Sequence, residues 1–155
     1  MPDLITHVLA ITPFKRSIRK NFSLILLGVL LPDIAGRTLG TIFPNSHFFN
    51  WAELALHTPI SLLLVIYLLS MFFPENQRKS VFTSFTLGAS FHFALDIFQK
   101  NATYNTPWLF HFSFSSFRIS VLWSDESIYL IPFLVVLNLV IYRREIFSRS
   151  ALRKE

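Results

Sequence analysis

The chain has 155 residues, of which 52% are hydrophobic and 15% are charged, and its formal net charge is +5. Soluble domains carry about 25% charged residues, so this composition and a mean hydropathy of +0.49 indicate a protein that is partly in contact with membrane lipid. The chain contains no cysteine, which excludes disulfides and thiolate metal sites.

The chain begins with a short apolar segment, MPDLITHVLAITPF, and the basic cluster KRSIRK follows it. A secretory signal has the reverse polarity, so we expect this segment to be retained. A helix of about a dozen residues rises about 18 Å, which would enter an apolar layer of about 30 Å without crossing it. The sequence therefore predicts a half-inserted N-terminal helix.

Four longer apolar stretches follow in the chain, at 21–43, 53–73, 81–98 and 128–142. The first is interrupted at Pro32, Asp33 and Arg37, so a kinked span is expected there. The second is long enough to cross a bilayer. We therefore predict an all-α fold, a polytopic membrane helical bundle of about four transmembrane helices plus the N-terminal helix, forming one domain over 1–155.

The basic residues predict an orientation for this bundle. Three clusters, which alternate spans would place on one side, hold Lys15, Arg16, Arg19, Lys20, Arg78, Lys79, Arg143, Arg144, Arg149, Arg153 and Lys154. Cytoplasmic segments are rich in Lys and Arg, so we expect a bacterial inner-membrane protein whose basic tail, 143–155, is cytoplasmic. Basic clusters beside apolar spans set topology, so membrane lipid rather than nucleic acid is the expected partner. The sequence does not predict the oligomeric state.

Polar residues within these stretches predict a metal site. Asp33, His57, His92 and Asp96 would lie at one depth, and His7 joins them if the first helix enters from the same side. A carboxylate near the middle of a bilayer costs about 2.5–3.5 kcal/mol. A divalent cation would neutralise both carboxylates and take neutral imidazole nitrogens as ligands.

Each of these residues also has a local explanation. His92 and Asp96 are four positions apart on one helix face and could bond to each other. Asp33 could pair with Arg37, and Asp96 with Lys100. Such pairs would explain the carboxylates and leave the histidines unexplained.

Four segments carry a resemblance to a known family: PDLITH at 2–7, LGVLLPDI at 27–34, LHTPISLLL at 56–64 and GASFHFALDIF at 88–98. In this order they resemble the YdjM-like family of predicted membrane-bound metal-dependent hydrolases, which is distantly similar to zinc-dependent phospholipase C and single-strand nucleases. The resemblance implies one or two divalent metal ions, most simply zinc, held by His7, Asp33, His57, His92 and Asp96.

The activity that the resemblance implies is hydrolysis of a phosphoester, such as a phospholipid head group, by metal-activated water. Asp33 would bridge two ions or orient the nucleophile. Arg37 would steady a phosphate, although pairing with Asp33 explains it equally well. Roles for Asp3, Glu53, His111 and Glu126 are not determined, and His111 stands where the family's aromatic loop has proline. His47, in the aromatic segment FPNSHFFN, is left outside the site.

Two other functions are compatible with the same residues. A metal could hold the helices together without catalysis, in which case its coordination should be closed. An ion or proton transporter could also use intramembrane His and Asp, but the chain is small and has no evident repeat.

Overall fold

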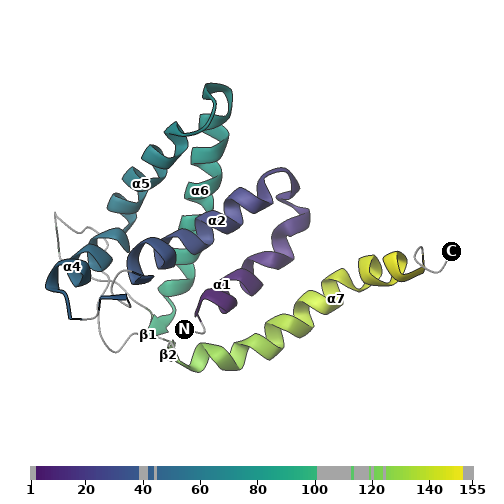
Figure 1. Ribbon diagram of the computed structural model, residues 1–155. Coiled ribbons are helices and arrows are strands. Elements are labelled where there is room, and N and C mark those ends of the chain that lie inside the picture. The colour runs from purple at the N-terminus through teal and green to yellow at the C-terminus, as the bar shows by residue number, and fades with distance from the viewer. Residues whose placement is uncertain are drawn as a thin grey trace.

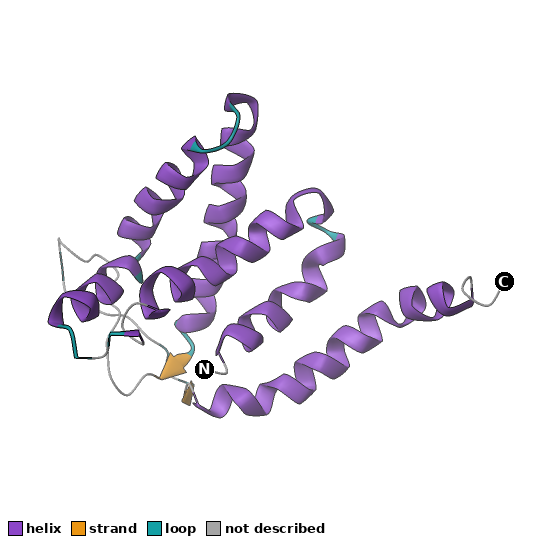
Figure 2. Cartoon of the chain, viewed as in Figure 1, coloured by secondary structure: helices purple, strands orange, loops and turns teal. Residues whose placement is uncertain are grey.

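The computed structural model describes residues 3–38, 42–43, 45–100, 113, 119, 121–123 and 125–151. The elements in these residues are, in chain order, α1 (Asp3–Ile11), the 3-10 turns η1 (Thr12–Arg16) and η2 (Arg19–Asn21), α2 (Phe22–Pro32), the π-helical turn η3 (Asp33–Arg37), α4 (His47–Leu56), α5 (Pro59–Met71), α6 (Glu75–Asp96), β1 (Gln99–Lys100), β2 (Leu122–Trp123), the 3-10 turn η4 (Asp125–Tyr129) and α7 (Leu130–Ala151). The prediction of a helical protein is confirmed, and a two-residue parallel strand pair is added to it (Figure 2).

Helix α6 is the central element of the fold. It packs against α2 and α5, and its end meets α1. The α5–α6 hairpin and the α1–α2 hairpin stand beside each other, and α7 runs along α1 until its C-terminal end projects away from the other helices (Figure 1). Elements far apart in the sequence are thereby brought to one end of α6.

Two glycines allow α2 and α6 to cross at backbone contact. A Cβ added to Gly88 would lie 2.1 Å from the carbonyl oxygen of Ile25, and a Cβ added to Gly28 would lie 2.4 Å from the carbonyl oxygen of Phe85. Real Cβ atoms do not approach backbone so closely. Only glycine fits at either position, and the crossing sets the distance between the elements that carry the polar residues.

Apolar side chains fill the spaces on both sides of this crossing. One cluster lies between α5 and α6 and contains Leu62, Ile66, Val81, Phe85, Ala89 and Phe93. A smaller cluster between α1 and α2 contains Ile11, Ile25 and Val29. Helix α7 is attached by polar contacts: Asn138 Nδ2 donates to the Leu9 carbonyl at 3.0 Å, and the Tyr142 hydroxyl donates to the Thr12 carbonyl at 2.8 Å.

The predicted bundle of transmembrane helices is wrong. Within the described ranges, no helix has both the length and the apolar character needed to cross a membrane. The stretch 53–73, predicted as one span, is divided between α4 and α5. Pro59 disfavours helical backbone at the preceding residue, and Thr58 is extended, with φ −121° and ψ 147°. The 13 residues of α5 rise only about 20 Å.

The other predicted spans fail for related reasons. Helix α2 has 11 residues and ends at Pro32, where the predicted interruption is found. Helices α6 and α7 have 22 residues each, but α6 begins with ENQRKS and α7 continues into RREIFSRSA. The predicted N-terminal helix exists as the nine residues of α1, and its half-inserted position depended on the same incorrect bundle. The cytoplasmic location of the basic tail is not tested by the fold and stays a prediction.

Candidate metal centre

Three imidazoles converge on one carboxylate at the C-terminal end of α6. The Nε2 atoms of His57, His92 and His7 lie 3.0, 3.2 and 3.3 Å from the carboxylate oxygens of Asp96. The side chain of Asp96 is 10% exposed, and those of His7 and His92 are 1% and 0% exposed. The cluster is therefore nearly closed to solvent by the protein itself.

Helix α6 places two of these residues by its own geometry. Gly88, His92 and Asp96 follow at intervals of four, so all three share one face of the helix. Gly88 brings that face against α2, and the next two turns therefore point toward α1 and η3. The imidazole of His7, from α1, stacks on that of His92 with ring centroids 4.3 Å apart and 20° between the planes.

His57 and Asp33 are placed by two prolines. His57 is the last residue before the extended Thr58, and its ring meets that of His92 edge-on at 5.3 Å. Pro32 lacks an N–H and cannot continue the α-helical bonding, and the chain widens into the π-helical turn that begins with Asp33. Both breaks in helical structure thus deliver a polar side chain to the cluster.

Two overlapping groups of side chains have the spacing of a metal site. His7, His92 and Asp96 form one group, and Asp33, His57 and His92 form the other. In each group, one ligand atom per residue lies within 4.8 Å of the others. All five residues predicted as metal ligands are therefore in one cluster, with His92 common to both groups.

The electrostatics of the cluster keep Asp96 ionised. Burial alone would raise the pKa of the Asp96 carboxyl, but hydrogen bonds from His57, His7 and His92 and the charge of His92 outweigh burial and hold this pKa well below its usual range. An ionised carboxylate has only acceptor oxygens, which can receive an N–H or bind a cation.

These residues fit a zinc ion. Zinc takes imidazole nitrogen and carboxylate oxygen in tetrahedral sites at about 2.0–2.2 Å, which places neighbouring ligand atoms about 3.3 Å apart. The observed separations are 3.0–3.3 Å. In addition, the buried Nδ1 atoms of His57 and His92 have no hydrogen bond to any described residue. A buried nitrogen in that condition is rare in proteins and is one sign of a bound ion or water.

A family model described as zinc-dependent phospholipase C matches residues 2–150, so the chain belongs to that family. The protein is a metal-dependent hydrolase that acts on phospholipid, and its cofactor is zinc. No curated protein and no solved structure matches the chain. The match does not support the narrower assignment to the membrane-bound YdjM-like group.

The other polar residues named in the sequence analysis lie outside this cluster or outside the described residues. His47 is exposed at the start of α4, as expected for a residue outside the site. Glu126 is half-buried in η4 and belongs to neither group of metal-site geometry among the described residues. The side chains of Asp3, Arg37, Glu53, Lys100 and His111 lie outside what the structure describes. The pairing of Arg37 with Asp33 is therefore untested, and Asp96 is already engaged by the histidines.

Sequence reasoning did not identify the residues that position the cluster. Gly28, Gly88 and Pro59 carry no ligand atom, yet they decide where three ligand-bearing elements meet. The sequence did contain a signal. Glycine costs stability inside a helix, so an isolated glycine in a helical segment indicates close packing, and Gly88 is one turn before His92.

Proposed function

We propose that His7, Asp33, His57, His92 and Asp96 form the zinc site at which this protein hydrolyses the phosphodiester of a phospholipid. The observation that supports this most directly is the approach of three imidazole Nε2 atoms to the buried Asp96 carboxylate, at 3.0–3.3 Å. Ordinary ion pairing needs one imidazole for one carboxylate. Three histidines from separate elements have a common purpose if they share a cation.

Zinc bound by these residues would supply positive charge to the phosphoryl oxygens and would lower the pKa of bound water to about 7. The histidines would contribute nitrogen ligands, and Asp96 would contribute negative charge that balances the cation. Their burial keeps each ring in one orientation. Asp33 is 6% exposed and belongs to the group with His57 and His92, which makes it the candidate to accept a proton from the attacking water.

In this reaction the water oxygen bonds to phosphorus, and the bond from phosphorus to the glycerol oxygen breaks. The glycerol oxygen leaves with a proton, giving diacylglycerol and a phosphorylated head group. Arg37 stays a prediction as the residue that binds the phosphate, since its backbone lies in η3 four residues after Asp33.

A structural metal site is the second candidate. The histidine side chains that contact Asp96 are between 0% and 11% exposed. Closed coordination of this kind is typical of structural zinc. The two functions differ in whether water and a phosphate can reach the cation, so metal content and hydrolysis must be measured on the same samples.

The test compares zinc content and phosphatidylcholine hydrolysis in the wild type and three variants: His92→Ala, Asp33→Asn and His47→Ala. His92→Ala should lose both zinc and activity, because His92 is common to both groups. Asp33→Asn should lower the hydrolysis rate by about 10²- to 10⁴-fold while retaining more zinc. His47→Ala, an exposed histidine, should resemble the wild type.

Each outcome separates the candidates. Equal zinc content in the wild type and His92→Ala would refute the site. Stoichiometric zinc in the wild type without any hydrolysis would leave the structural role.

A further inference from the structure

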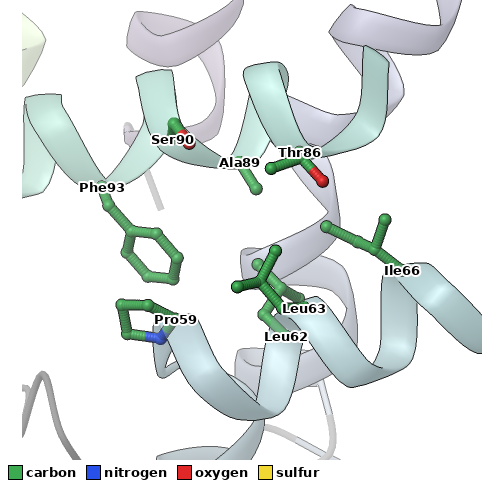
Figure 3. Close-up of a pocket in the computed structure, with 8 residues that line it drawn as sticks. All are labelled: Pro59, Leu62, Leu63, Ile66, Thr86, Ala89, Ser90 and Phe93. Carbon is green, nitrogen blue, oxygen red and sulfur yellow. The ribbon is translucent and has the colours of Figure 1, made fainter. Parts of the chain in front are cut away.

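A pocket of about 100 Å³ lies between α5 and α6 (Figure 3). Its lining is Pro59, Leu62, Leu63, Ile66, Thr86, Ala89, Ser90 and Phe93. Six of these side chains are apolar, and the two polar ones are hydroxyls on one face of α6, one turn apart. Leu63 is 42% exposed, and Ser90 is also exposed, so the pocket has an entrance at the surface.

One end of the pocket adjoins the metal centre. Phe93 and Pro59 face each other there, and Ile66 and Thr86 lie at the other end (Figure 3). The ring of Phe93 meets those of His57 and His92 edge-on, with centroids 5.8 and 5.7 Å apart. Phe93 therefore both lines the pocket and contacts two histidines of the metal centre.

The hydroxyl of Thr86 indicates that the ligand of this pocket also has a polar group. Its Oγ1 is buried and has no hydrogen bond to any described residue. Its neighbours on α6 behave differently: the Thr83 and Ser84 hydroxyls donate to the carbonyls of Lys79 and Ser80, as hydroxyls in helices usually do. The occupant of the pocket should therefore carry an oxygen that can accept a hydrogen bond, in addition to an apolar body.

We propose that this pocket binds the beginning of one acyl chain of the phospholipid, with the chain against the apolar walls and its ester carbonyl accepting a hydrogen bond from the pocket hydroxyls. The inference rests on the proposed function, because it needs the phosphate at the metal centre. An apolar cavity of about 150 Å³ accommodates benzene, so a pocket of 100 Å³ has room for about four carbons. The remainder of the chain would leave through the entrance at Leu63 and Ser90.

The size of the pocket makes a quantitative prediction. Burial of a methylene changes kcat/KM by about fourfold, so activity on short-chain, monomeric phosphatidylcholines should rise by about that factor per added methylene. The rise should level off once about four carbons are buried. Substrate with no acyl chain, p-nitrophenyl phosphocholine, should gain nothing from the pocket.

Two variants of α5 test this. Leu63→Trp places a large ring at the entrance, while Leu64→Trp, at the neighbouring position, is 60% exposed and does not line the pocket. Leu63→Trp should lose the dependence on chain length and keep the wild-type rate on p-nitrophenyl phosphocholine. Leu64→Trp should behave as the wild type on both. In a third variant, Thr86→Val, the ratio of kcat/KM for ester-linked lipid to kcat/KM for ether-linked lipid should fall.

Calorimetric binding of the non-hydrolysable phosphonate analogues of dibutanoyl and dihexanoyl phosphatidylcholine provides a second measurement. Tighter binding of the longer analogue by the wild type, reduced in Leu63→Trp alone, supports the pocket even if no phosphodiester is cleaved, in which case only the proposed function fails. Hydrolysis by the wild type with the same chain-length dependence in Leu63→Trp overturns the pocket and leaves the proposed function intact.

Discussion

Replacing Gly88 with alanine tests whether the contact between α2 and α6 holds the metal centre together. The new Cβ would lie 2.1 Å from the Ile25 carbonyl oxygen and 2.7 Å from the Val29 nitrogen, and both are backbone atoms that no side-chain rotation can move. Ordinary contact begins at 3.4 Å, so the helices must separate by more than 1 Å. Metal–ligand distances tolerate about 0.2 Å, and Asp33 would move with α2 relative to His92.

We expect Gly88→Ala to lower the free energy of unfolding by about 3 kcal/mol, the upper part of the range for overpacking, because backbone meets backbone. For a chain of this length, that corresponds to a fall in Tm of about 6–12 °C. Helix propensity acts in the opposite direction, since alanine is favoured over glycine by about 1 kcal/mol in an open helix.

The assay is thermal unfolding with and without zinc, together with zinc content after gel filtration. The control is Leu87→Ala, the adjacent residue on α6, whose side chain is 54% exposed; its Tm should change little and its zinc content should not change. A Gly88→Ala protein that melts at or above the wild-type temperature with full zinc would refute the role given to this crossing.

Three further outcomes follow from the site and its attachments. Removing zinc with a chelator should lower Tm, because zinc at 100 times its Kd contributes about 2.7 kcal/mol; differential scanning calorimetry measures this, and an unchanged Tm would argue against a bound metal. Pro59→Ala should let Thr58 become helical and displace His57, which we expect to weaken zinc affinity by about 10- to 100-fold in a competition titration, and unaltered affinity would contradict the placement by Pro59. Asn138→Ala should cost about 1 kcal/mol in urea denaturation by removing the hydrogen bond to Leu9, without loss of zinc, and a loss of zinc would show that α7 supports the metal centre.

Local sequence rules were sufficient for the features that depend on neighbours in the chain. The apolar stretches predicted helices, and Pro32 interrupts the first long one where expected. The spacing of His92 and Asp96 places both on one face of α6 whatever the surroundings. The residue types indicated a divalent cation, and the resemblance of four segments to a known family implied zinc and hydrolysis, which the family match confirms.

Composition led to the wrong prediction of transmembrane helices. High hydropathy predicts membrane spans, but hydropathy averaged over a stretch of chain does not show where helices end. The proline after Thr58 divides the longest apolar stretch into two short helices, and polar residues occupy the ends of α6 and α7. A count of apolar residues contains neither fact.

The sequence alone determined which residue types could hold a cation, since imidazole and carboxylate chemistry does not depend on the fold. Only the tertiary structure decided that His7 and His57, 85 and 35 positions before His92 in the chain, reach the same carboxylate. The reason is physical: contacts across such separations depend on how closely helices approach, and that approach depends on backbone meeting backbone at Gly28 and Gly88.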